Sequence, residues 1–490
     1  MCGINGCIHL KDFFFSKEDF SSATNLLNNR GPDAFGVKET ILNRFVLKLG
    51  HQRLSILGID KFGDQPMTSE NDLFSIIYNG EIYNHNFLRK QLSSTSNINW
   101  KSSCDTETLL NLFEYEGIDS ILNKIEGMFS FCLFDRINQK LILARDRSGE
   151  KPLYLSTGES FLGFASDLSP LKEIPGFCSS LDKFATQKYL QHNYIPSPLS
   201  VYEKSFKLPP GSYISIDLNK YKPKPCSSFE ELIQSEGVYF KLWWSLDEGY
   251  ENKLQNLSIS DQEVIDETES LLEASVNKQL ISDVPLGAFL SGGIDSSLVV
   301  AMMQKNGRES KTYTVGFDFA DYDESIYAEK IANYLGSNHT TYTCNKQDVL
   351  DIIPQLPRAF SEPFADSSQI PTMLVSRLAR QDVKVALSGD AGDELFGGYN
   401  RYLIANKYWR YLKNISPKIR KGGLTLLNRI PNNILSFLFY FSPFSRNLSG
   451  SAEVRVLKIL DKLKEINDPE SFYKSMTVEW KVQSNIMNFD

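Results

Sequence analysis

The sequence lacks an excess of basic residues. Its 490 residues include 52 Lys and Arg against 60 Asp and Glu, which gives a formal net charge of −8. The sequence pI is near 5.4. An acidic chain without a long Lys/Arg block does not match the electrostatic footprint of a general nucleic-acid binder. We therefore expect no nucleic-acid partner.

Paired cysteines are also lacking. The chain has seven Cys, an odd number, and no C-x-x-C spacing. This pattern argues against a disulfide framework and against a cysteine zinc site. It favours a reducing compartment, and we expect the protein to be cytoplasmic.

Long apolar runs are missing as well. The first nine residues do not combine a basic region with an apolar stretch, so we expect no signal peptide. The most apolar later segment, residues 434–441, is about eight residues long, whereas a membrane span needs about twenty. We predict a buried or interface helix there and no membrane association.

A chain of this length, with 41% hydrophobic and 23% charged residues, is expected to form two or three soluble domains. Residues 2–215 contain many apolar, strand-like runs and few helical ones, which indicates a layered, β-rich domain. Residues 216–260 are rich in proline and charge at first and are predicted as a linker with interdomain packing. Residues 261–490 are predicted as a second large domain.

The second domain contains a glycine turn between a strand and a helix. Leu286-Gly-Ala-Phe-Leu290 reads as a short buried strand, Ser291-Gly-Gly293 as a tight turn, and residues 295–303 as a helix. Such a turn points backbone N–H groups and the positive end of the helix dipole at one place, which suits a phosphate. Asp295 could bind Mg²⁺ on that phosphate. An ordinary strand–turn–helix without a ligand is the alternative.

The same domain alternates strands and helices. A helix is predicted from Ser260, where Glu263 completes a capping box. Further strands are predicted at 311–317, 339–342 and 384–387, with helices between them, which indicates a parallel sheet covered on both faces. Ligands of such sheets bind at the carboxyl ends of the strands.

An acidic glycine-rich loop follows the last of these strands. Leu387-Ser-Gly-Asp-Ala-Gly-Asp-Glu-Leu-Phe-Gly-Gly-Tyr399 places three acids within five residues. A solvated acidic turn is one interpretation. A carboxylate cluster for Mg²⁺ that faces the first loop and pairs with Asp295 is the one we favour.

Cysteine at position 2 is a possible amino-terminal nucleophile. Removal of Met1 would place an α-amino group, with a pKa of about 7.7–8, within a few bonds of a thiol near 8.5. One residue could then supply both nucleophile and base. Taken alone, a cysteine at this position is more often without function.

Five motifs in order change that interpretation. They are the N-terminal Cys-Gly-Ile, Arg-Gly-Pro-Asp, Arg-Leu-Ser-Ile, Tyr-Asn-Gly-Glu-Ile-Tyr-Asn and Ala-Arg-Asp-Arg-x-Gly-x-Lys-Pro-Leu-Tyr. Together they resemble the class II glutamine amidotransferase domain over residues 2–215. The resemblance implies that Cys2 attacks the glutamine side-chain amide and that Asn79 and Gly80 form the oxyanion hole.

The same resemblance implies a binding site for the glutamine backbone charges. Arg53, beside Leu54, would bind the α-carboxylate, and Glu81 and Asp105 would bind the α-ammonium group. For Glu81 and Asp105, a turn or capping role is the alternative.

The second half resembles the synthetase domain of glutamine-hydrolysing asparagine synthetases. The resemblance is carried by Ser-Gly-Gly-x-Asp-Ser, by Ser-Asp-Val-Pro-Leu-Gly before it, and by Ser-Gly-Asp-x-x-Asp-Glu-Leu-Phe-Gly-Gly-Tyr. It implies an N-terminal αββα sandwich of antiparallel sheets followed by a doubly wound parallel-sheet α/β ATP-pyrophosphatase domain. It also implies ATP and Mg²⁺, with Mg²⁺ held by Asp295 and Asp393 and a catalytic role for Asp390. The implied ATP-binding residues are Phe289, Leu290, Ser291, Gly292, Gly293, Asp295, Ser296, Val315, Ser388 and Gly389.

The family's reaction suggests the function. Glutamine would yield ammonia, ATP would adenylate the aspartate side chain, and ammonia would displace AMP to give asparagine. Two alternatives stay open: amidation of a sugar uronate or another carboxylate in surface-polysaccharide assembly, and a chain with glutaminase activity only. Glutamine, aspartate and ATP are the expected substrates, and a homodimer is possible.

Two departures from the family bear on the acceptor. Asp390 stands where many members have Glu. The sequence ends at Asp490, before the family's Ser-x-x-x-x-x-Glu-x-Arg-x-Pro-x-x-Asp segment and a basic stretch that closes over the adenylate. We therefore expect that the sequence is truncated or that its acceptor site is built differently.

Overall fold

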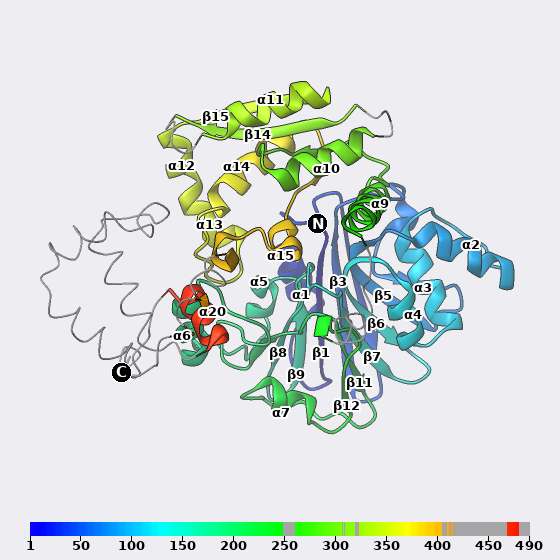
Figure 1. Ribbon diagram of the computed structural model, residues 1–490. Coiled ribbons are helices and arrows are strands. Elements are labelled where there is room, and N and C mark those ends of the chain that lie inside the picture. The colour runs from blue at the N-terminus through cyan, green and yellow to red at the C-terminus, as the bar shows by residue number, and fades with distance from the viewer. Residues whose placement is uncertain are drawn as a thin grey trace, which may run out of the picture. The chain divides into compact units, whose positions relative to one another are not determined.

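Figure 1 shows a computed structural model of the chain. The structure describes residues 1–247, 260–305, 307, 309–318, 323–403, 409–410, 413–414 and 468–479. The helix predicted at 434–441 lies outside these residues. The chain divides into two units, one made of Met1–Tyr189 and Tyr194–Gly389 and the other of Leu190–Asn193 and Asp390–Asp490.

The first sheet of the larger unit contains the strand that begins beside Cys2. It has six strands in the order β10-β8-β9-β1-β3-β2, all antiparallel to their neighbours. β1 pairs with β3 from Gly3 opposite Gln52 onward. The strands span Gly3–Leu10 (β1), Ala34–Ile41 (β2), Phe45–Arg53 (β3), Tyr154–Thr157 (β8), Phe161–Ala165 (β9) and Ser205–Lys207 (β10).

The second sheet carries the predicted Asn79-Gly80-Glu81 motif. It has six antiparallel strands in the order β12-β11-β7-β6-β5-β4. Nearly continuous runs of buried residues on β5 and β6 match a sheet that is covered on both faces, by the other sheet and by helices. The strands span Met67–Thr68 (β4), Phe74–Ile82 (β5), Gly127–Asp135 (β6), Lys140–Arg145 (β7), Ser212–Asp217 (β11) and Val238–Leu242 (β12).

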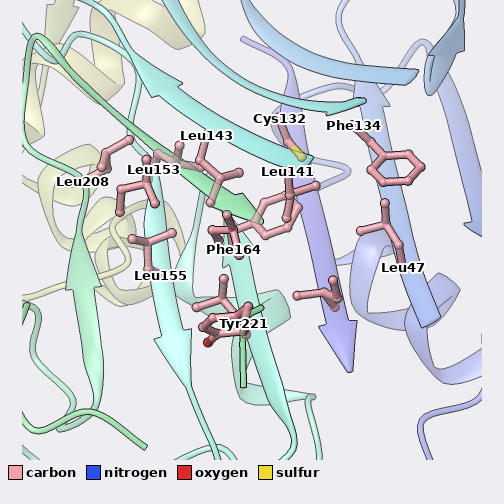
Figure 2. Close-up of a cluster of buried hydrophobic side chains, with 14 of the residues drawn as sticks. Leu47, Cys132, Phe134, Leu141, Leu143, Leu153, Leu155, Phe164, Leu208 and Tyr221 are labelled. Carbon is pink, nitrogen blue, oxygen red and sulfur yellow. The ribbon is translucent and has the colours of Figure 1, made fainter. Parts of the chain in front are cut away.

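The two sheets pack face to face over an apolar core, shown in Figure 2. Leu47 and Phe164 come from the first sheet, and Phe134 and Leu143 come from the second. Helices cover both outer faces. They span Lys17–Asn25 (α1) and Leu168–Lys172 (α5) on the first sheet, and His85–Thr95 (α2), Asp105–Tyr115 (α3) and Ile118–Lys124 (α4) on the second. The predicted αββα sandwich is confirmed.

The sandwich extends past residue 215. β12 pairs with β11 from Leu242 opposite Ser212 to Val238 opposite Ile216. Part of the segment predicted as a linker is therefore the edge strand of the second sheet. The helix α7 (Phe229–Ile233) connects these two strands, and its Phe229 and Leu232 enter the core between the sheets. α6 (Lys183–His192) lies earlier in the chain.

A parallel sheet follows in the same unit. Its four strands have the order β15-β14-β13-β16. They span Leu286–Phe289 (β13), Lys311–Phe317 (β14), Asn338–Cys344 (β15) and Val385–Leu387 (β16). The direction of winding changes between β13 and β16, which is where doubly wound sheets bind ligands.

Helices cover both faces of this sheet, which confirms the predicted doubly wound fold. One apolar cluster joins one face to α9, α10 and α11, and two further clusters join the other face to α12 and α14. The predicted capping box of Ser260 and Glu263 begins α9. The helices span Asp261–Gln279 (α9), Ile294–Gln304 (α10), Ser325–Leu335 (α11), Lys346–Ile352 (α12), Leu356–Ala359 (α13) and Gln369–Ala379 (α14).

The smaller unit is described in part. It includes α15 (Gly392–Phe396), which begins after Ala391 in a left-handed conformation, and α20 (Pro469–Thr477). The rings of Tyr402 and Tyr473 stack 5.6 Å apart. None of the helices in the described part of the chain is both long and apolar enough to cross a membrane.

Candidate functional site

Cys2 directly precedes β1, and its thiol contacts Leu54, the residue directly after the neighbouring strand β3. The backbone N–H of Leu54 donates to Cys2 Sγ at 3.3 Å, and Sγ lies 3.6 Å from Leu54 O. The pairing of β1 with β3 brings these residues together, because Gly3 is opposite Gln52. Arg30 Nε donates to Cys2 O at 3.1 Å. Leu54 thus contacts the thiol of Cys2, and Arg30 contacts its backbone carbonyl.

The surroundings of Cys2 affect both ionisable groups at this end of the chain. Burial lowers the pKa of the Met1 α-amino group to about 6. Burial raises the pKa of the Cys2 thiol, and the terminal ammonium group and the Leu54 N–H oppose that rise. Because a thiolate is the reactive form, the hydrogen bond from the Leu54 N–H favours reaction.

Asn79 lies in the middle of β5 and is fully buried. Neither its Nδ2 nor its Oδ1 has a hydrogen-bond partner. Buried amides almost always have partners, and an unpaired one costs about 1–3 kcal/mol. This arrangement suits the predicted role of Asn79 in an oxyanion hole, where the missing acceptor would come from the substrate.

Gly80 follows Asn79 at a place where a side chain cannot fit. A Cβ atom there would lie 2.2 Å from Met128 O and 2.8 Å from Phe129 Cα. The close pairing of β5 with β6 causes this conflict. The glycine is therefore required by packing, whatever the role of its N–H group.

Glu81 and Asp105 differ in their surroundings. Asp105 is buried at the start of α3, and its Oδ2 accepts from the Ile82 N–H at 2.9 Å and the Tyr78 hydroxyl at 2.8 Å. Burial raises the pKa of Asp105, against these hydrogen bonds. Burial and then Asp105 raise the pKa of Glu81, which is only partly buried as a residue. The Asp105 carboxylate thus already accepts hydrogen bonds from β5, while the Glu81 side chain is more accessible to a ligand.

Arg53 has partners that the sequence did not predict. Its Nη1 donates to Asp60 O at 2.8 Å and to Asp64 Oδ1 at 2.9 Å. Its Nη2 donates to Leu57 O at 3.3 Å and to Gly58 O. In this structure the guanidinium holds the segment after β3, and only Nε is left for a further acceptor.

Two residues near Cys2 were quoted within motifs but given no role. Arg30 contacts the Cys2 carbonyl, and its Nη2 is buried without a hydrogen-bond partner. Lys151 is buried, its pKa is lowered by that burial, and its Nζ lies 3.2 Å from Met1 Sδ. The sequence signal that could have pointed to these two residues is their position within motifs: Arg30 begins Arg-Gly-Pro-Asp, and Lys151 belongs to the Lys-Pro part of the fifth motif.

The predicted nucleotide loop joins β13 to α10. Ser291 and Ser296 share a hydroxyl–hydroxyl hydrogen bond of 2.9 Å, and the Ser291 N–H donates to Ser296 Oγ at 3.2 Å. The helix begins after Gly293, without a side-chain cap, and Asp295 is in its first turn. The hydroxyl pair fixes the loop, and the helix dipole makes its opening suitable for an anion.

Two glycines allow close packing around this loop. A Cβ on Gly292, at φ +80°, would lie 2.7 Å from Ala328 N. A Cβ on Gly389 would lie 2.7 Å from Ser296 N. Gly389 follows β16, so the loops after β13 and β16 meet at the point where the winding reverses.

The other predicted nucleotide residues lie at strand ends of the same sheet. Leu290 is buried, donates its N–H to Tyr313 O at 2.9 Å and accepts from Thr314 Oγ1. Phe289 and Val315 are partly buried and pack against the two apolar clusters that join this sheet to α12 and α14. Ser388 comes directly before Gly389.

Asp390 and Asp393 belong to the smaller unit, whereas Asp295 belongs to the larger one. Shared metal binding by Asp295 and Asp393 therefore stays a prediction. No group of three His, Cys, Asp or Glu suited to a metal occurs among the described residues. Mg²⁺ needs only one or two carboxylates when phosphates supply other ligands, and Asp295 fits that requirement.

Two protein-family models match the chain. The model described as "Glutamine amidotransferase domain" matches residues 1–227. The model described as "Asparagine synthase" matches residues 267–473. The two matches coincide with the antiparallel sandwich and the region of the parallel sheet.

Individual relatives support the same assignment. A Methanocaldococcus jannaschii protein named "Putative asparagine synthetase [glutamine-hydrolyzing] 2" is 32% identical over 99% of this chain and 89% of its own length. Asparagine synthetase [glutamine-hydrolyzing] 1 of Bacillus subtilis is 32% identical over 82% of this chain, but only 59% of that relative is covered. Asparagine synthetase [glutamine-hydrolyzing] 3 of B. subtilis is 28% identical over 81% of this chain and 63% of its own length. The chain belongs to the glutamine-hydrolysing asparagine synthetase family.

Proposed function

We propose that the protein is a glutamine-dependent asparagine synthetase. Two observations carry the proposal together: the Leu54 N–H donates to the Cys2 thiol, and the buried Asn79 amide has no hydrogen-bond partner. Amide hydrolysis through a thioester needs a nucleophile and a hydrogen-bond donor that is free to bind the oxyanion. Membership of the family supplies the second, ATP-dependent half.

The first half-reaction releases ammonia from glutamine. Removal of Met1 would place the α-amino group on Cys2, where it takes the thiol proton as sulfur attacks the amide carbon. The oxyanion accepts from Asn79 Nδ2 and the Gly80 N–H. The proton then passes to the leaving nitrogen, ammonia departs, and water hydrolyses the thioester to glutamate.

Recognition of the glutamine α-ammonium group falls mainly to Glu81. Asp105 already accepts two hydrogen bonds, and we propose that its carboxylate adds to the attraction for the ammonium group. The α-carboxylate would be bound by Arg53, beside Leu54. Because both Nη atoms hold carbonyls of the segment after β3, this binding requires an exchange of partners or use of Nε.

The second half-reaction uses ATP. We propose that the loop from Ser291 to Ser296 binds the pyrophosphate, with Asp295 and Asp393 holding Mg²⁺, which would neutralise phosphate charge. The aspartate side-chain carboxylate attacks the α-phosphate, pyrophosphate leaves, and ammonia then displaces AMP from the acyl-adenylate. Asp390 would anchor or deprotonate the attacking nitrogen.

A second acceptor is worth testing because of Asp390. The side chain of Asp is one methylene shorter than that of the Glu found in many family members, which changes the reach at this position. A nucleotide-sugar uronate is the alternative carboxylate. Purified protein supplied with ATP and glutamine should form an amide product when aspartate is added. If product formed with the uronate and not with aspartate, the uronate would become the proposed acceptor.

The Cys2→Ala variant tests the assignment of the two halves. It should lose glutamine-dependent product formation and keep formation with free ammonia, and both should release AMP and pyrophosphate. Cys178→Ala, at a partly exposed cysteine with no role in the proposed site, is the matched control and should behave as the unmodified protein. Release of ADP, or unchanged glutamine use by Cys2→Ala, would rule out the mechanism.

A further inference from the structure

The segment from Leu54 to Gly58, here called the Cys2 loop, directly follows β3 and touches the nucleophile. Leu54 supplies the N–H group on the Cys2 thiol. Gly58, at φ +56°, has no room for a side chain, since a Cβ would lie 2.9 Å from Cys104. Arg53 holds the carbonyls of Leu57 and Gly58. The position of this loop therefore determines what the thiol contacts.

Residues of the parallel-sheet domain, within the same unit of the chain, bind the Cys2 loop. Asp283 N–H donates to Ile56 O at 3.0 Å, and Asp283 Oδ2 accepts from the Gly58 N–H at 2.8 Å. This gives two hydrogen bonds from one residue that lies 225 positions away in sequence.

Lys384 makes a second connection. Its Nζ donates to Asp33 Oδ2 at 2.8 Å and reaches Ser55 O at 3.4 Å. The same Asp33 oxygen accepts from the Ser55 N–H at 2.8 Å. The ion-pair side chains are 21% and 26% exposed, so the charges are partly shielded from water. Lys384, Asp33 and Ser55 form one connected group.

Asp283 and Lys384 share a position in the fold. Asp283 lies three residues before β13, and Lys384 directly precedes β16. These strands are parallel neighbours, with Leu286 opposite Val385. Their other ends lead to the Ser291–Ser296 loop and to Gly389. A pair of strands only three to four residues long thus separates the Cys2 loop from the proposed ATP loop.

We propose that Asp283 and Lys384 are positioning residues for glutamine hydrolysis: by holding Ile56, Gly58 and Ser55, they keep the Leu54 N–H on the Cys2 thiol. The assignment rests on the proposed function of Cys2. Neither side chain contacts the thiol, so each acts through the loop. The glutamine site is then completed by residues of the ATP-dependent domain.

Two substitutions test this. Lys384→Met keeps the length of the side chain and removes its charge, and Asp283→Asn keeps the shape while weakening the contact with Gly58. Each should lower kcat/KM for glutamine about tenfold, the effect of losing one charge-assisted hydrogen bond. Pyrophosphate release with free ammonia should stay within about twofold, because the thiol takes no part in it. Lys384→Arg should restore part of the loss.

A measurement that is independent of turnover is the rate at which iodoacetamide alkylates Cys2, followed by mass spectrometry of the N-terminal peptide. Without a fixed Leu54 N–H, the thiolate fraction should fall and alkylation should slow by about tenfold. Lys278→Met is the control, since it breaks an exposed ion pair with Glu126 and leaves the Cys2 loop untouched.

Three outcomes would overturn the proposal. They are an unchanged or faster alkylation rate in both variants, equal losses with glutamine and ammonia, and the same effect in Lys278→Met. If a variant does not fold, the other still decides, because each removes different contacts. Failure of the proposed function would look different: no amide product would form, yet alkylation of Cys2 would still depend on Lys384 and Asp283.

Discussion

At the scale of single residues, Asn79 is the most informative side chain. A fully buried amide without any partner is a cost to folding that neighbouring residues do not offset. The sequence predicted Asn79 through the Tyr-Asn-Gly-Glu motif. It could not predict that the amide would be unsatisfied, because that depends on how β5 packs inside the sandwich.

Asn79→Ala should therefore separate activity from stability. Glutamine-dependent kcat should fall by about 10²–10³, the usual effect of removing one oxyanion donor. The free energy of unfolding in urea should not fall by more than about 1 kcal/mol, since no hydrogen bond is lost. A large loss of stability, or an equal loss of ammonia-dependent activity, would show that Asn79 is structural.

His51 gives a prediction about acid stability. It is 1% exposed on β3, and its Nε2 lies 3.0 Å from Tyr78 O. Burial lowers the pKa of His51 from 6.5 to about 3. Between these values the unfolded chain binds a proton that the folded chain does not, so stability is lost as the pH falls from 6.5 towards 3.

His51→Gln should reduce that acid sensitivity while keeping a donor for Tyr78 O. The slope of unfolding free energy against pH should become smaller by up to about 1.4 kcal/mol per pH unit in this window. Urea titrations at several pH values measure it. Above pH 6.5 the difference between the two proteins should be constant, and a difference that keeps changing there would contradict the assignment.

Arg53 shows where reasoning from the sequence stopped. The motif and the residue type pointed to the glutamine α-carboxylate, which stays a prediction, and the structure shows partners that neither signal indicates: the carbonyls of Asp60, Leu57 and Gly58 and the carboxylate of Asp64. Guanidinium groups bind carbonyl and carboxylate oxygens with similar geometry. Which oxygens Arg53 contacts depends on the path of the chain after β3, and local residue spacing does not encode that path.

At the scale of secondary-structure elements, short sequence patterns predicted several helices and strands correctly. The capping box at Ser260 and Glu263, the strand 311–317 and the helix after Gly293 were all predicted from short patterns. β12 was missed because its preceding segment is rich in proline and charge. Its assignment depends on pairing with β11, a contact that sequence alone does not show.

The loop between β13 and α10 gives the prediction at this scale. Gly292→Ala should abolish ATP-dependent product formation and destabilise the protein by about 1–3 kcal/mol, since its Cβ would collide with Ala328 N at a positive φ. Glutamine hydrolysis should persist. Both activities and urea unfolding should be measured together.

Gly336→Ala is the matched control for that variant. Gly336 has φ +74°, close to the φ of Gly292, but a Cβ there would meet nothing within 4 Å. It should cost about 1 kcal/mol of stability and leave ATP use intact. Equal effects of the two substitutions would mean that backbone strain, and not the loop, explains the loss.

At the scale of the whole molecule, the sequence predicted both folds and the order of the two family domains along the chain. It did not predict that Asp283 and Lys384 would hold the loop beside Cys2. Those contacts join residues more than two hundred positions apart, and each of the residues looks like an ordinary charged residue before a strand. Contacts between domains depend on how finished folds dock, which residue spacing does not encode.

The most direct test follows the amide nitrogen of glutamine. Protein is incubated with ATP, Mg²⁺, aspartate and glutamine labelled at its amide nitrogen, and the products are identified by mass spectrometry. The account predicts label in the side chain of asparagine, with AMP and pyrophosphate formed in equal amounts, and no transfer of label by Cys2→Ala. Unlabelled asparagine, ADP in place of AMP, or labelled ammonia with no amide product from aspartate would contradict it.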